Sequence, residues 1–194
     1  MNQEEVLFKQ SRVISTSILL CIVGFLMSFV PDVSWPLLGF NLLLATICAV
    51  VFVILWRTHR QHSKRYFSLV TYVMLNAIVI YASIPFFRVI SGSSIIFWLA
   101  MIVEIVMLVV PYFYSENIAF GVTNPSKSKI GKVYIIYAPL VIVLGGIIYK
   151  AALLTQNPDA FGFSVFLYLL AILFLFLTPI FLIKPKRFKE IEDR

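Results

Sequence analysis

Apolar runs of membrane-spanning length, separated by short polar segments, make up almost the whole chain. A transmembrane helix needs about 20 predominantly apolar residues to cross the hydrocarbon core of a bilayer. Six runs reach this length, and clusters of Pro, Gly, Ser, Asn and Asp separate most of them. The pattern therefore predicts an all-α, polytopic integral membrane protein, a bundle of six transmembrane helices with short loops, spanning at 13–30, 37–56, 66–87, 94–113, 133–151 and 163–183.

The composition agrees with this class. Hydrophobic residues make up 61% of the chain and charged residues 13%, whereas an ordinary soluble domain has roughly 25% charged residues. Because the spans use nearly all of the 194 residues, we expect residues 1–194 to form a single membrane domain with no soluble domain. We also expect no cleavable signal peptide, since the first run is long enough to span and no Ala-x-Ala-like site follows it.

Lys and Arg residues are distributed unevenly among the predicted loops. With a cytoplasmic N-terminus, Arg88 and Lys150 are the outer basic residues, and the rest of the 16 Lys and Arg residues fall on the cytoplasmic side. The positive-inside rule then predicts a multi-pass protein of the plasma (cell) membrane with both termini in the cytoplasm. The same residues account for the net charge of +7, so we expect contacts with the lipid bilayer and its anionic cytoplasmic headgroups, and no nucleic acid.

Glu104 is the costliest residue in this pattern, because it lies in the middle of the fourth apolar run. An ionised carboxylate at the centre of a transmembrane helix costs about 2.5–3.5 kcal/mol on insertion scales. If the third and fourth spans form a helical hairpin, Asn76 lies at nearly the same depth as Glu104. Tyr72, Asn76 and Ser83 share one stripe of the third span. The sequence therefore predicts a polar intramembrane site of these four residues.

Two interpretations of this site follow from the residues. In the first, protonated Glu104 donates a hydrogen bond to the side-chain carbonyl of Asn76, close to Tyr72, and holds the hairpin together. In the second, Glu104 exchanges a proton or binds a cation as its surroundings alternate between the two membrane faces. No Lys, Arg or His lies at the centre of any span, so a charge relay is missing and the first interpretation is favoured.

Other reactive residues give weaker patterns. His59 and His62 have a spacing that can chelate a metal on a helix, but basic residues surround them and no carboxylate or Cys completes a site. Cys21 and Cys48 fall within spans at similar depths and lack the Cys-x-x-Cys spacing of a redox motif, so they are interpreted as small apolar side chains. The sequence predicts no catalytic residue, no metal and no cofactor.

The size and six-span layout are shared with the substrate-binding subunits of energy-coupling-factor vitamin transporters and with membrane peptidases that process pheromone precursors. The first span lacks the small-residue motifs of the former, and no Cys follows the two histidines as the latter require, so the motifs assign the chain to no family. We expect a non-catalytic accessory, immunity-type or scaffold subunit that contacts another membrane protein or forms a homo-oligomer. The alternative is a proton-coupled small-solute transporter or channel that uses Glu104.

Overall fold

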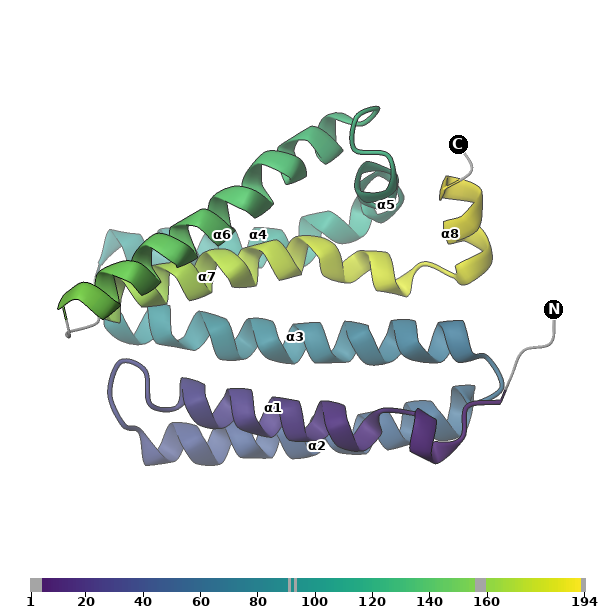
Figure 1. Cartoon of the computed structure of the whole chain (residues 1–194), viewed down its shortest axis with the longest axis horizontal. Helices are drawn as coiled ribbons and strands as arrows, with labels where there is room; N and C mark the ends of the chain where they lie inside the picture. The colour runs from purple at the N-terminus through teal and green to yellow at the C-terminus, as the bar shows by residue number, and fades with distance from the viewer. Residues whose placement is uncertain (1–4, 91, 93, 156–159, 193–194) are drawn as a thin grey trace.

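The computed structural model describes residues 5–90, 92, 94–155 and 160–192. These residues form an all-helical bundle without a β-strand (Figure 1). Six of the described helices are long and apolar enough to cross a membrane, as the hydrophobic pattern predicts. Residues 156–159, in the predicted loop between the fifth and sixth spans, lie outside the described residues.

The long helices are α1 (Val13–Met27), α2 (Trp35–His59), α3 (Ser63–Val89), α4 (Ile95–Phe113), α6 (Lys129–Thr155) and α7 (Ala160–Leu177). Shorter elements that the sequence analysis did not predict are η1 (Phe8–Gln10), α5 (Ser115–Thr123), η2 (Thr178–Leu182) and α8 (Pro185–Glu192).

Local residues explain several of the helix boundaries. Ser94 caps α4, because its Oγ accepts a hydrogen bond from the backbone N–H of Ile96 at 3.2 Å. Pro36 lies in the first turn of α2, where its missing N–H costs nothing. Pro179 follows the end of α7, and its missing N–H favours the tighter η2 turn over further α-helix.

The long helices run along the long axis of the molecule, and η1 and α8 lie at the same end (Figure 1). We call this the basic end, because the α2–α3 turn and α8 bring most of the positive side chains there. Its described basic residues are Lys9, Arg12, Arg57, Arg60, Lys64, Arg65, Lys127, Lys129, Lys132, Lys184, Lys186, Arg187 and Lys189. The uneven distribution of Lys and Arg along the sequence therefore places most of the described basic residues at one end of the bundle.

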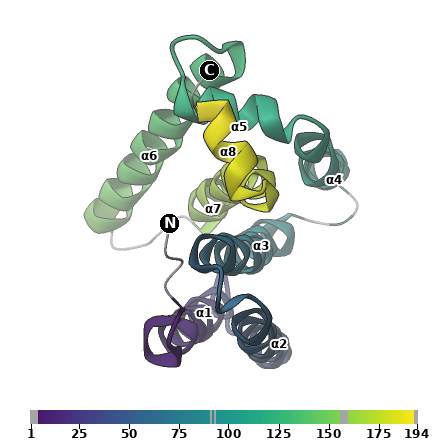
Figure 2. The same ribbon diagram turned by 90° about the vertical axis from the view of Figure 1, so that its right-hand side faces the viewer.

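Helix α3 contributes to two separate apolar cores. One core joins α3 to α1 and α2 through buried residues such as Leu20, Phe52 and Tyr66. The other joins α3 to α4 and α7 through residues such as Val79 and Leu167. Figure 2 shows α3 and α7 in the middle, α1 and α2 on one side, and α4 and α6 flanking α7 on the other.

The third and fourth spans do not form the closely packed hairpin that their short connection predicted. Along their described lengths α3 and α4 pack little against each other, and α7 packs against both. Ile90, which follows α3, and Ser94, which precedes α4, both have extended backbone conformations. Contacts that still join α3 to α4 include the rings of Phe87 and Phe97, 5.3 Å apart, and the hydroxyls of Tyr72 and Tyr112, at 2.8 Å.

Candidate functional site

Glu104 lies on the covered stripe of α4. The residues of this stripe, Phe97, Ala100, Glu104, Met107 and Pro111, are buried or half-buried, while most other side chains of α4 are exposed. They recur every three or four residues, which places them on one helix face. The carboxyl of Glu104 is therefore directed toward the rest of the bundle.

Two polar side chains from other helices lie near this carboxyl. They are Ser83 on α3 and Tyr168 on α7. The Oγ of Ser83, a residue that is 4% exposed, lies beside the Glu104 carboxyl but makes no hydrogen bond of normal geometry to any described residue. Three helices thus contribute one oxygen-bearing side chain each to a small polar junction in an apolar bundle.

Tyr168 is held in place by its other contacts. Its hydroxyl donates a hydrogen bond to the backbone carbonyl of Ala100, one turn before Glu104 on α4, at 2.7 Å. Its ring stacks on Phe86 of α3, with ring centroids 4.4 Å apart. Tyr168 therefore ties the three helices together at the level of the Glu104 carboxyl.

A second buried hydroxyl lies close by in the sequence of α7. Ser164 precedes Tyr168 by four residues, which is about one helical turn, and it is fully buried. Its Oγ has no hydrogen-bond partner among the described residues. A buried hydroxyl without a hydrogen-bond partner costs about 1–3 kcal/mol of stability. The hydroxyls of Ser83 and Ser164 are therefore both unfavourable in this apolar core.

Asn76 and Tyr72 belong to a different level of α3. The amide of Asn76 donates to the backbone carbonyl of Tyr72 at 2.8 Å, within its own helix. The hydroxyl of Tyr72 meets Tyr112 near the basic end of α4. Of the four predicted site residues, the structure therefore brings Ser83 and Glu104 together and shows Tyr72 and Asn76 as a separate pair.

The geometry of the turn explains this division. Asn76 lies thirteen residues before the end of α3, and Glu104 lies nine residues after the start of α4. The two depths therefore differ by about 6 Å at 1.5 Å per residue. Ser83, six residues before the end of α3, is on the other side of the Glu104 level and faces the core that includes α7.

Sequence reasoning missed Tyr168 and Ser164. Both lie in an apolar run with no charged residue, and neither a Tyr nor a Ser is unusual there. The available signal was depth alone, since Tyr168 lies eight residues from the start of α7 and Glu104 nine from the start of α4.

The histidines and cysteines take no part in this site. The ring Nδ1 of His59 lies 2.8 Å from the hydroxyl of its neighbour Thr58. Cys48 is buried and Cys21 half-buried in the core of the first three helices, and both are free thiols. Among the described residues, no group of three or more His, Cys, Asp or Glu side chains is placed to hold a metal ion.

A third polar cluster stabilises the first three helices. The buried amide of Asn41 donates to the carbonyl of Gly24 at 3.0 Å and to the hydroxyl of Ser28 at 2.9 Å. The hydroxyl of Tyr81 donates to the backbone carbonyl of Asn41 at 2.9 Å. These bonds join neighbouring helices, which is the arrangement expected of a packing contact, although the side-chain oxygen of Asn41 has no hydrogen-bond partner among the described residues.

Comparison of the chain with protein-family models, with curated proteins and with solved structures finds no match. The fold defines an all-helical protein with six helices of membrane-spanning length. The particular feature of this bundle is the junction of Glu104, Ser83 and Tyr168.

Proposed function

We propose that the chain is a multi-pass integral membrane protein of the plasma membrane, with the basic end in the cytoplasm. Large apolar side chains on the outside of the bundle support this proposal, for example Ile136 and Ile142 on α6, which are 69% and 71% exposed. Exposure of so many apolar side chains is unfavourable in water but favourable in contact with lipid acyl chains. The gathering of Lys and Arg residues at one end supports the orientation.

For the activity, we propose a proton-coupled small-solute transporter or channel in which Glu104 exchanges the proton. One observation carries this proposal: the Glu104 carboxyl lies beside a buried Ser83 hydroxyl that has no other partner. The hydrogen bond from Glu104 to the side-chain carbonyl of Asn76 that would make Glu104 a purely structural residue is not among the described contacts. The amide N–H of Asn76 donates within its own helix instead.

A serine hydroxyl suits a carboxyl that changes its protonation state. The Ser83 hydroxyl can donate a hydrogen bond to an ionised carboxylate and can accept one from a protonated carboxyl. The amide carbonyl of an asparagine can only accept, so it would stabilise the protonated form alone. Tyr168 adds a second polar neighbour at the same level.

Labelling with dicyclohexylcarbodiimide tests whether Glu104 exchanges protons, because this reagent reacts with protonated carboxyls in apolar surroundings. The protein in liposomes is labelled over a range of pH and the modified residue is identified by mass spectrometry. We expect labelling at Glu104 that falls as the pH rises, and a shifted midpoint in Ser83→Ala. Glu116, which lies on α5 at the basic end, is the matched carboxylate that should remain unlabelled.

Flux supplies the second measurement. Proton entry into liposomes that enclose a pH-sensitive dye is followed under an imposed potential, for wild type and for Glu104→Gln and Glu104→Leu. We expect both substitutions to abolish the flux while Gln preserves folding. If the labelling of Glu104 does not depend on pH and Glu104→Gln retains full flux, Glu104 does not exchange protons.

The accessory, immunity-type or scaffold function is the second candidate. The observation that favours it is the uncovered face of α6, on which Ile136, Ile142, Val143 and Ile147 are each at least 60% exposed. A helix of another membrane protein, or of a second copy of this chain, fits such a face by side-chain packing. This function predicts that Glu104→Gln is without effect on phenotype, which is the opposite outcome of the same experiment.

A further inference from the structure

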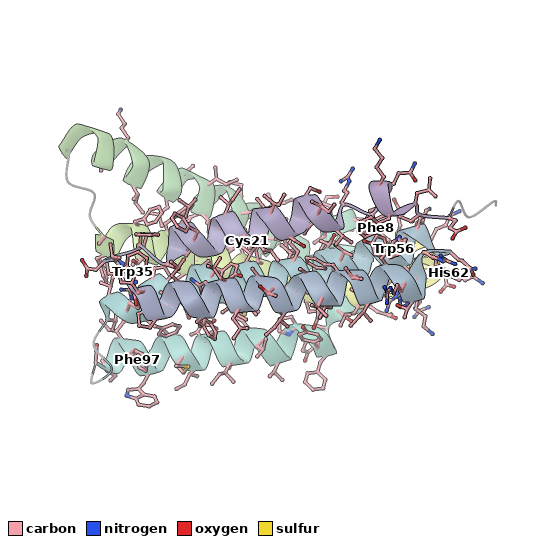
Figure 3. The ribbon with its side chains drawn as sticks, turned by 90° about the horizontal axis from the view of Figure 1, so that it is seen from below. Phe8, Cys21, Trp35, Trp56, His62 and Phe97 are labelled. Atoms are coloured by element: carbon pink, nitrogen blue, oxygen red, sulfur yellow. The ribbon has the colours of Figure 1, made fainter. Side chains whose placement is uncertain are left out.

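Helices α1 and α2 form a groove on the outer face of the bundle, in the half nearest the basic end. The groove has a volume of about 590 Å³, within the range of ~300–1,000 Å³ typical of small-molecule sites. Figure 3 views the bundle from this side, with α1 and α2 in front and Phe8 and Trp56 near the basic end. No other described helix covers α1 and α2 on this side (Figure 1).

The lining of the groove is apolar along its length and charged at one end. Ile14 and Ile18 of α1 and Val50 and Ile54 of α2 line it, and each is more than half exposed. Ala49 is a small residue of its lining. Arg57 is the charged residue of the lining and stands at the basic end.

Arg57, unlike Arg60 and Arg12, has no partner among the described residues. The Arg60 guanidinium pairs with Glu5 at 3.2 Å, and the Arg12 guanidinium lies 6.0 Å from the ring of Phe67. For Arg57 no ion pair or hydrogen bond is found among the described residues. Its planar guanidinium is therefore available for an anion, and it matches phosphate oxygens in a bidentate geometry.

The length of the groove matches one leaflet of a bilayer. On α2 it runs from Arg57 to Thr46, eleven residues that span about 16 Å at 1.5 Å per residue. Half of the ~30 Å hydrocarbon core is about the same distance. A phospholipid of the leaflet at the basic end can thus place its phosphate at Arg57 and one acyl chain along the groove.

Two other polar residues line the groove but do not compete for this role. The Thr46 hydroxyl donates to the carbonyl of Leu42 within its own helix at 2.8 Å. The Oγ of Ser17 is covered by protein atoms and is not accessible from the groove. The charge at Arg57 and the apolar walls are therefore the recognition elements.

We propose that this groove is a binding site for one anionic phospholipid, held by Arg57 at its phosphate and by α1 and α2 along an acyl chain. The inference requires membrane insertion and is independent of any role of Glu104. It differs from general attraction of anionic lipid to a basic surface, because it names one cation among the thirteen described at this end.

Native mass spectrometry of the full-length protein, released from nanodiscs of mixed phosphatidylglycerol and phosphatidylcholine, tests the site. We expect wild type to retain one phosphatidylglycerol, and Arg57→Gln to lose about fivefold in its retention, corresponding to the ~1 kcal/mol that one basic residue contributes at an anionic surface. Arg60→Gln is the matched control, since it removes an equal charge outside the groove, and it should retain the lipid as wild type does.

Ala49→Phe tests the acyl-chain part of the site by filling the groove. We expect it to lower the retention of both lipids, with an unchanged circular dichroism spectrum. Equal losses in Arg57→Gln and Arg60→Gln would show that the whole basic surface attracts the lipid, and would overturn the proposal. Unchanged retention in Ala49→Phe would overturn the placement of the acyl chain.

Discussion

Gly131 is the position in α6 where one added methyl group should be most disruptive. It lies in the first turn of α6, where the backbone passes close to α5 and to the segment between them. A Cβ built on Gly131 would collide with the carbonyl oxygen of Gly121, and would lie 2.6 Å from the Cα of Pro125. Because these are backbone atoms, they cannot rotate away as a flexible side chain would.

The magnitude follows from two opposing terms. Replacing Gly by Ala in a helix gains roughly 0.5–1 kcal/mol in backbone entropy. Overpacking in a closely packed region costs about 1–3 kcal/mol, and contact with backbone on two sides favours the upper part of this range. We therefore expect Gly131→Ala to lower the free energy of unfolding by about 1–2 kcal/mol.

Gly146→Ala is the matched control on the same helix. A Cβ at Gly146 would meet nothing within 4 Å, so this substitution keeps the entropic gain without the collision. We expect it to leave stability unchanged or to raise it by up to about 1 kcal/mol. The difference between the two alanine variants approximates the cost of the collision alone.

Unfolding in mixed micelles with increasing sodium dodecyl sulfate, followed by circular dichroism, gives the free energy for each variant. Equal stabilities of Gly131→Ala and Gly146→Ala would refute the close approach of α5 and α6 on which the argument depends.

Two further substitutions test other contacts. Asn41→Leu should cost about 1–3 kcal/mol in the same titration, because it leaves the Ser28 hydroxyl oxygen without its donor and removes one of the two side-chain donors to the Gly24 carbonyl. Asn76→Leu is the control and should cost less than half as much, because the Asn76 amide bonds its own helix. Arg187→Gln should release α8, measured as faster amide hydrogen exchange, since the Arg187 guanidinium bonds Glu116 at 2.8 and 3.0 Å. The carboxylates of Glu116 and Glu190 raise the pKa of Arg187, so this contact should not weaken at alkaline pH; slower or equal exchange in the variant would contradict the docking.

The positions of the six long helices could be predicted because each is encoded by its own apolar run. The run at 66–87 predicts the core of α3, although the helix extends from Ser63 to Val89. Helices α5 and α8 could not be predicted in the same way, since elements of nine and eight residues are too short to form from local preference. They form because Ile118 and Ile191 are buried against the rest of the protein.

The level of the candidate site along the helix axes could be predicted from the sequence, but the helix faces that form it could not. Counting residues from the ends of the spans placed Glu104 near the level of Asn76, which is within two helical turns of its observed neighbour Ser83 on α3. Which face of α3 and α4 is covered depends on α7, the last of the spans, and its run is apolar on every side. The apolar run shows no helical periodicity of polar residues that would distinguish the face of α7 that carries Tyr168.

The central place of α7 has a consequence for biogenesis. In the membrane protein proposed above, synthesis from the N-terminus would deliver α3 and α4 to the bilayer before α7, yet α7 is the helix on which both of them pack. During that interval Ser83 and Glu104 lie on helix faces that have not yet received their cover. If the proposed insertion holds, the Glu104 carboxyl is covered only when α7 is added, and a chain interrupted before Ala160 would leave that carboxyl facing the lipid.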